Sequence, residues 1–290
     1  MSQRSVRRRL GRCGPVAALL AVASVWGVRA QDVRLPGRPD SVKFAVVSDT
    51  HIGSRPDEGV AREMAAVRAK WPFEMVLMLG DIVRGNPKPN DFVERFEKPF
   101  GPLLDAGVQF YAALGNHDDR SIRFYKPWNM GGESYYSVSR KGVQFFVLDS
   151  GRLDPPQIAW IDGALKDSQA DWKICGFHHP PYSDGGTHGS QGGVRAVLEP
   201  IFVKYGVNVV FSGHDHLYER IRPQKGITYF VTGGAGPVRR GDITPGRMTA
   251  ASFDQDQTFM VVEIDGDTLF FEAISRTGRR VDSGVIHRQR

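Results

Sequence analysis

The 290-residue sequence predicts an α/β fold built from mixed sheets. Short apolar runs rich in β-branched and aromatic residues alternate with segments of helical periodicity, at the spacing of β-α-β units. Two hairpin signals interrupt this rhythm and predict antiparallel strands beside the parallel ones. No linker, repeat or charge run divides residues 31–290, and about 260 residues is the upper range for a single core. We therefore expect one domain over 31–290.

The individual elements follow from local patterns. Buried strands are predicted at 42–48, 75–79, 110–114, 173–177 and 207–212. Apolar residues at three-to-four spacing predict helices over 58–70, 91–104 and 193–204, and Asp154-Pro155-Pro156 starts a further helix that continues to Leu165. Lys141-Gly142 and Asp265-Gly266 predict hairpin turns, with a last strand at 281–287.

Residues 1–30 resemble an export signal. A basic segment ends near Arg12, an apolar run of 15 residues follows, and Val28-Arg29-Ala30 has the small-x-small form of a cleavage site. A membrane anchor is the alternative, but a spanning helix needs roughly 20 apolar residues. We expect an exported protein, periplasmic or extracellular, with no membrane span after cleavage. The arginines allow either the general or the twin-arginine export route.

Composition excludes several classes of protein. With 41% apolar and 24% charged residues, the chain is neither a disordered tail nor a disulfide-stapled miniprotein. The first 30 residues hold six of the 38 basic residues and no acidic one, which leaves 32 of each sign. Nothing in this balance indicates a nucleic-acid-binding surface. Cleavage would remove Cys13, and Cys175, inside a predicted strand, is interpreted as a buried apolar residue.

Polar clusters follow the predicted strands where each one ends. Together they comprise residues 48–51, 80–81, 115–118, 178–179 and 213–216. Ligands bind at this edge of an open α/β sheet, so the clusters are expected to converge. Seven of the eight histidines lie in or beside these segments, and Asp, Asn and His together hold divalent transition metals. In the pair His178-His179, neighbours on an extended segment point to opposite faces, so only one is expected to reach a shared metal easily.

Five motifs in this order, Asp-x-His, Gly-Asp, Gly-Asn-His-Asp, His and Gly-His-x-His, resemble the calcineurin-like metallophosphoesterases over residues 43 to about 286. The resemblance implies a four-layer α/β/β/α sandwich of two mixed sheets and a centre of two divalent metal ions. Carried over position by position, the metal ligands would be Asp49, His51, Asp81, Asn116, His178, His214 and His216. Asp81 would bridge the two ions, and manganese, iron(II) and zinc all suit the set.

The resemblance also implies a mechanism. Two divalent ions about 3.5–4 Å apart can share a hydroxide, bring its pKa near neutrality and clamp the phosphoryl oxygens for in-line attack. His117 matches the residue that contacts the phosphate and assists the leaving group. Asp118 beside it would orient or charge that ring.

Further motifs place the chain near the purple acid phosphatases: 177–182, 213–220 and 229–236. One departure is informative. Arg84 stands where that branch has a tyrosine metal ligand, and His51 stands where it has glycine, so an imidazole would replace the phenolate. We expect no iron(III) charge-transfer band from iron-loaded protein, and a divalent first metal.

Several residues have two interpretations. His188, in the glycine-rich segment 183–193, matches a second histidine of the family that contacts phosphate, but the segment is equally well a surface loop. Arg84 would grip substrate oxygens, or it is a solvated loop residue. Residues 233–256 would line the rim of the site or form an irregular connection. Trp160, Trp172 and the phenylalanines are predicted in the core.

Phosphomonoester hydrolysis of a small phosphorylated substrate is the leading functional prediction. A phosphodiesterase acting on cyclic or linear nucleotides is the first alternative, because the same metals and ligands serve both reactions. A catalytically silent metal-binding protein is the second.

Overall fold

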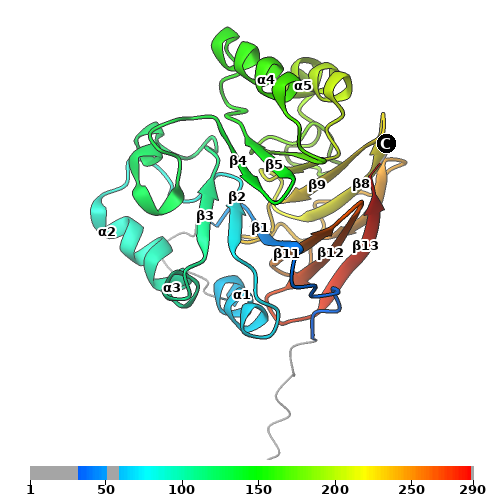
Figure 1. Ribbon diagram of the computed structural model, residues 1–290. Coiled ribbons are helices and arrows are strands. Elements are labelled where there is room, and N and C mark those ends of the chain that lie inside the picture. The colour runs from blue at the N-terminus through cyan, green and yellow to red at the C-terminus, as the bar shows by residue number, and fades with distance from the viewer. Residues whose placement is uncertain (1–31, 51–58, 289–290) are drawn as a thin grey trace, which may run out of the picture.

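The fold described below comes from a computed structural model of the chain, in which residues 32–50 and 59–288 are described (Figure 1). The predicted signal, His51 and the first residue of the predicted helix 58–70 lie outside these ranges. Within them, no helix is long and apolar enough to cross a membrane.

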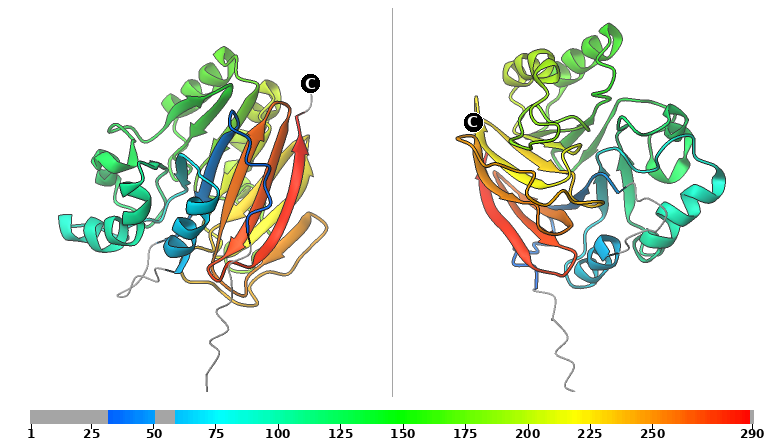
Figure 2. Two further views of the ribbon diagram at one scale, coloured as in Figure 1. Left: turned by 60° about the horizontal axis from the view of Figure 1, so that its bottom comes forward. Right: turned by 180° about the vertical axis from the view of Figure 1, so that it is seen from behind.

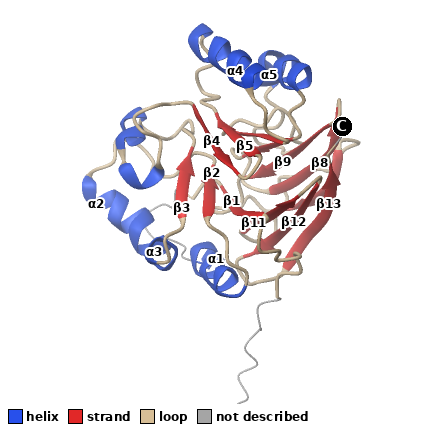
Figure 3. Ribbon diagram, viewed as in Figure 1, coloured by secondary structure: helices blue, strands red, loops and turns tan. Residues whose placement is uncertain are grey.

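Two mixed sheets form the centre of the molecule (Figures 2 and 3). The six-stranded sheet has the order β13-β12-β11-β1-β2-β3, and the seven-stranded sheet has the order β10-β8-β9-β7-β6-β5-β4. The first comprises β1 (Val42–Val47), β2 (Met75–Met78), β3 (Gln109–Ala112), β11 (Thr258–Asp265), β12 (Thr268–Ser275) and β13 (Arg280–His287). The second comprises β4 (Tyr136–Arg140), β5 (Val143–Val147), β6 (Trp172–Gly176), β7 (Val209–Ser212), β8 (Tyr218–Gln224), β9 (Ile227–Thr232) and β10 (Thr249–Phe253).

Helices cover the outer face of each sheet. The six-stranded sheet is covered by α1 (Gly59–Lys70), α2 (Pro89–Phe92) and α3 (Lys98–Asp105), and the other by α4 (Pro155–Asp167) and α5 (Gly192–Tyr205) (Figure 1). Short 3₁₀ turns span Arg120–Phe124 and Lys126–Trp128. The predicted helix 91–104 is interrupted by a π-helical turn, Val93–Glu97. The reason is Pro99, which has no N–H to continue the hydrogen-bond ladder, so α3 starts anew there.

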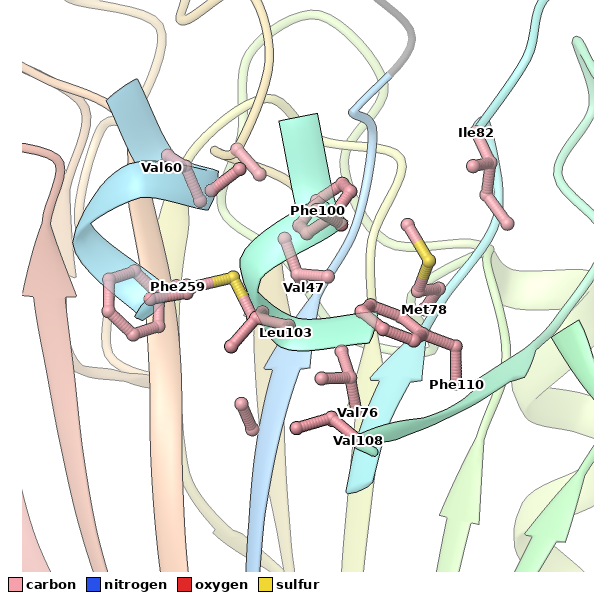
Figure 4. Close-up of a cluster of buried hydrophobic side chains, with 14 of the residues drawn as sticks. Val47, Val60, Val76, Met78, Ile82, Phe100, Leu103, Val108, Phe110 and Phe259 are labelled. Atoms are coloured by element: carbon pink, nitrogen blue, oxygen red, sulfur yellow. The ribbon is translucent and has the colours of Figure 1, made fainter. Parts of the chain in front are cut away.

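Three hydrophobic clusters fill the three spaces between layers. Successive side chains of a strand point to opposite faces, so Val46 and Leu77 pack between the sheets, whereas Val47 and Val76 face the helices. Figure 4 shows the helix side of the six-stranded sheet, where Phe100 and Leu103 of α3 meet Phe110 of β3. The four-layer α/β/β/α sandwich predicted from the family resemblance is therefore confirmed.

The predicted core is correct in part. Trp172 and Cys175 are fully buried, and burial raises the pKa of the Cys175 thiol. Four of the side chains predicted in the core are only half-buried: Phe92, Phe253, Phe270 and Trp160. Trp160 packs against Tyr135 and the cluster under α4 without being enclosed by it. Phe124 is 64% exposed, since the irregular segment after β3 turns it to solvent under the guanidinium of Arg123.

Candidate metal centre

The polar clusters meet at one edge of the sandwich, between the two sheets. Strands β1, β2 and β3 are parallel, and so are β5, β6, β7 and β9, so the loops after them leave at common edges. Backbone hydrogen bonds link these loops: Asp49 N donates to Gly80 O at 3.1 Å, and Gly213 N donates to His178 O at 2.9 Å. Residues far apart in sequence are thereby brought together.

Asp49 is a buried carboxylate with one oxygen unsatisfied. Its Oδ2 accepts from Ser48 Oγ at 2.7 Å and from His214 N at 2.8 Å. Its Oδ1 is buried and accepts no hydrogen bond from the described residues, although His216 Nε2 lies 3.5 Å away. Burial, and then the neighbouring charge of Asp81, raise the pKa of Asp49. A cation at Oδ1 would remove this cost, so the site fits a metal ion.

Asp81 is the second buried carboxylate. Its Oδ1 accepts from His117 N at 2.9 Å, and its Oδ2 lies 3.5 Å from His178 Nε2. Ligand atoms of Asp49, Asp81 and His178 all lie within 4.8 Å of one another. A Cβ at Gly115 would come within 2.0 Å of Asp81 Oδ1, so only glycine lets the backbone approach this carboxylate so closely.

Backbone carbonyls set the tautomers of two histidines. The Nδ1–H of His178 donates to Leu79 O at 2.9 Å, because a carbonyl can only accept, and His216 Nδ1–H donates to Pro237 O at 2.7 Å. Each ring therefore turns its Nε2 toward a buried carboxylate, 3.5 Å away in both cases, and Nε2 is the atom left to bind a metal ion. This support behind a ligand is typical of metal-binding histidines.

His178 Nε2 stands at the centre of the converging donors. It lies 2.9 Å from Asn116 Oδ1 and 3.2 Å from His214 Nδ1. Burial, and then the rings of His178, His179 and His188, lower the pKa of His214 to about 2, which keeps its imidazole neutral. The oxygen atoms of Asp49, Asp81 and Asn116 thus face three imidazoles, a set that suits divalent transition metals.

Three of these residues have a left-handed backbone. The φ angles of Asp49, Asp81 and His214 are 59°, 51° and 70°, and each residue lies just beyond the end of a strand. Such conformations cost about 1–3 kcal/mol each in residues other than glycine and are held by their surroundings. Three of the six left-handed residues other than glycine in the described ranges therefore lie where the candidate ligand atoms converge.

The family model for calcineurin-like phosphoesterases matches residues 42–218, the span that contains every donor described above. The chain belongs to this family. It is accordingly a metal-dependent phosphoesterase, as predicted from the order of its motifs.

Comparison with curated proteins gives purple acid phosphatases as relatives. Purple acid phosphatase 17 of Arabidopsis thaliana is 27% identical over 248 residues, which cover 72% of this chain and 73% of the relative. Tartrate-resistant acid phosphatase type 5 of Oryctolagus cuniculus is 25% identical, over 68% of this chain and 74% of the relative. By contrast, the chain spans only 39% of purple acid phosphatase 1 of Ipomoea batatas.

Solved structures share the fold at lower identity. Purple acid phosphatase PPD1 from yellow lupin superimposes with a TM-score of 0.69 at 18% identity, over 88% of this chain and 55% of that one. GAP50, described as the anchor in the inner membrane complex of Plasmodium, gives 0.71 at 16% identity, over 86% and 90%. These likenesses support the sandwich architecture.

The structure places the other predicted site residues of the phosphoesterase around this centre. His117 is half-buried, and its backbone N–H donates to the carboxylate of Asp81. Asp118 accepts from the backbone N–H groups of Ile82, Val83 and Gly115, at 2.9, 3.1 and 3.0 Å, and these bonds shape the loop around Asp81. Burial raises the pKa of Asp118 to about 7. Arg84 is exposed, and its backbone pairs with that of Asp118.

His188 lies on the exposed side of the centre. Its ring stacks on that of His214, with centroids 4.1 Å apart and 28° between the planes. Asp215 holds the loop: its carboxylate accepts from Ser183 Oγ at 2.6 Å and from Gly189 N at 3.1 Å. The segment 233–256 braces the same loop, since Gly186 N donates to Asp242 O at 2.8 Å.

His179 is a residue that the sequence prediction left out. A ligand atom of its ring lies within 4.8 Å of those of His178 and His214. Both adjacent rings face the centre, because the chain bends at 178–179 and the alternation of an extended strand does not apply there. Ser150 Oγ, 2.9 Å from His179 Nδ1, fixes the ring. His51 lies outside the described residues.

Proposed function

We propose that this phosphoesterase hydrolyses phosphomonoesters at a dinuclear metal centre. Its ligands would be Asp49, Asp81, Asn116, His178, His214 and His216, and the sequence motif adds His51. The observation that carries the proposal is the convergence of two buried carboxylates and a lone pair of His178 within 4.8 Å. Uncompensated burial of such groups is costly, and divalent cations compensate for it.

Two divalent ions, when bound, would supply positive charge to the phosphoryl oxygens and lower the pKa of a water molecule. An imidazole binds a metal ion as a neutral ligand, so only the two carboxylates would balance four positive charges, and the loaded centre would attract a phosphate dianion. This charge argument favours a monoester, which carries two negative charges, over a diester, which carries one.

Protein groups around the centre would act on the substrate directly. The backbone N–H of His117 donates to Asp81, which holds this residue at the centre. The imidazole of His117 is proposed to protonate the departing alkoxide. His188, stacked on His214, and the exposed Arg84 are proposed to contact the phosphate oxygens. Asp118 is proposed to hold the loops of Asp81 and Asn116 through its bonds to backbone N–H groups.

The test compares kcat/KM for 4-nitrophenyl phosphate and for bis(4-nitrophenyl) phosphate on metal-stripped protein reconstituted with manganese. We expect a preference for the monoester of at least tenfold, because the centre is arranged for a dianion. A preference for the diester would refute the proposal and favour a nucleotide phosphodiesterase. No turnover of either ester by protein with two bound ions would favour the catalytically silent alternative.

We also propose export, on the basis of the N-terminal sequence. The basic segment, the apolar run and Val28-Arg29-Ala30 together support cleavage before Gln31. Expression in a double-membraned bacterium, followed by N-terminal sequencing of the periplasmic fraction, should give a chain starting at Gln31. A full-length chain in the membrane fraction would instead indicate an anchor.

A further inference from the structure

A pocket of about 470 Å³ opens beside the metal centre. The loops after β3, β5 and β6 and the start of α5 form its walls, and it shares Asn116 with the donor set. His179, which touches both His178 and His214, lines it as well. The group attached to a phosphate at the centre therefore has this space to enter.

Arg120 lines one side of the pocket, and the buried carboxylate of Asp149 fixes its side chain in place. Arg120 NH1 donates to Asp149 Oδ2 at 2.6 Å, and NH2 donates to Ser134 Oγ at 2.9 Å. The Asp149 side chain is 3% exposed, and its Oδ1 accepts from Gly151 N at 3.1 Å. A guanidinium has five N–H donors, so Arg120 keeps three beyond these two bonds. Its position is set before any substrate arrives.

The charges of the lining residues disfavour a substrate that carries a second anionic group besides the reacting phosphate. Among the described lining residues, Asp118 and Asp149 carry carboxyl groups, and Arg120 is the one lysine or arginine. The ion pair of Arg120 with Asp149 is internally neutral. A bisphosphate or a sugar acid would therefore bring its extra charge to a lining that is neutral or acidic.

The lining also offers little to a flat apolar group. Apart from the imidazole of His179, the described lining residues include no aromatic ring on which a base or an aryl group would stack. They do include uncharged donors and acceptors, in Asn116, Ser150 and Gln191. Several fixed polar groups around an open space suit a ligand that both donates and accepts at many points.

We propose that this pocket receives a polyhydroxylated leaving group, so that the substrate is a sugar or polyol monophosphate. The inference rests on the proposed phosphomonoesterase function. Arg120 donates to hydroxyl oxygens and Gln191 both donates and accepts, so a substrate with hydroxyl groups replaces the water in the pocket. An analogue without hydroxyls leaves these polar groups unpaired, which lowers its kcat/KM.

The test compares glucose 6-phosphate with cyclohexylmethyl phosphate, a primary alkyl phosphate of similar ring size without hydroxyls. Manganese-loaded protein should give a kcat/KM ratio of about 10–100 in favour of the sugar. Arg120→Ala and Gln191→Leu should each narrow this ratio at unchanged metal content. Arg280→Ala is the matched control, because Arg280 is also held by a buried acid, Glu272 at 3.0 Å, but lies on β13.

The inference would be overturned by a ratio near one in the native protein, or by a higher kcat/KM for glucose 1,6-bisphosphate or AMP than for glucose 6-phosphate. It would also be overturned if Arg280→Ala narrowed the ratio as much as Arg120→Ala. Protein that cleaves 4-nitrophenyl phosphate but none of these sugar phosphates would likewise refute it. Protein that cleaves no phosphomonoester at all would instead refute the proposed function.

Discussion

Among the described residues, the two sheets present opposite kinds of candidate metal ligand. Loops after the six-stranded sheet carry the oxygen ligands Asp49, Asp81 and Asn116, and loops after the seven-stranded sheet carry the imidazoles His178, His214 and His216. His51, outside the described residues, would add one imidazole from the sequence that follows β1. Neither sheet alone brings a complete set together. The packing between the sheets therefore decides the distance between oxygen and nitrogen donors.

Each sheet also supports the donors of the other. His214 N–H, from the seven-stranded side, donates to Asp49, and Leu79 O, from the six-stranded side, accepts from His178. Metal binding should therefore depend on two distinct things: the donors themselves and the core that sets the sheets at their spacing. The predictions below separate these contributions.

The largest effect is expected from Asp81→Asn, which removes a charge from the oxygen side. Mutating a residue that only hydrogen-bonds to a metal ligand costs up to roughly 100-fold in metal affinity. Asp81→Asn changes a ligand itself, so metal affinity should fall by more than this, and phosphatase activity should fall with it. Metal analysis after dialysis and kcat/KM for 4-nitrophenyl phosphate measure the two losses. Asp282→Asn is the control, since Asp282 is a largely buried acid bound by Arg220 and Tyr218 elsewhere. Equal loss of metal in both variants would contradict a direct role for Asp81.

A second prediction compares the core between the two sheets with the core between the seven-stranded sheet and its helices. Phe44 of β1 packs edge-on against Phe145 and Phe211 of the opposite sheet, with ring centroids 5.0 and 6.1 Å away. Phe202 of α5 is equally buried but lies outside the space between the sheets. Phe44→Ala and Phe202→Ala should each lower the free energy of unfolding by about 3–5 kcal/mol.

Only Phe44→Ala should also weaken metal binding, because only that variant loosens the contact between oxygen and nitrogen donors. Denaturant unfolding of metal-free protein gives the stabilities, and titration with manganese gives the affinities. If both variants bind manganese as tightly as the native protein, the spacing of the sheets does not control the centre.

The smallest effect is expected from His188→Ala on the exposed side of the centre. The ring contacts His214 only by stacking and is absent from the close donor clusters among the described residues. Metal content should stay at the native value while kcat for 4-nitrophenyl phosphate falls, by about 10- to 100-fold if the ring assists the phosphate. Loss of metal in this variant would instead make His188 structural.

Much of the fold followed from sequence periodicity. The strands that carry Asp49 and Asp81 are continuous apolar runs, and their observed ends lie within one residue of the prediction. The helix predicted over 91–104 is present, but its interruption was missed, because apolar spacing continues through Pro99 and does not register the lost N–H. Strands β8, β9 and β10 were missed as well. The half-exposed residues of β8 and β10 lack the apolar pattern of the central strands, whereas the buried run of β9 was interpreted only as part of the motif 229–236.

The site residues were predictable where a motif directly follows a strand. They were less predictable where the chain bends. Spacing within a motif says nothing about a ring such as His179, whose position depends on a bend and on Ser150 from another loop. The polar pocket was missed for the same reason, because Arg120 and Asp149 belong to different loops and no pattern in the sequence pairs them.

The most direct measurement is the activity of metal-stripped protein as manganese is returned in steps. Bound metal per chain and turnover of 4-nitrophenyl phosphate are recorded on the same samples. The account predicts no activity without metal and a maximum at two ions per chain, because oxygen and nitrogen donors of both sheets are needed. Full activity of the stripped protein, or saturation at one ion, would contradict it.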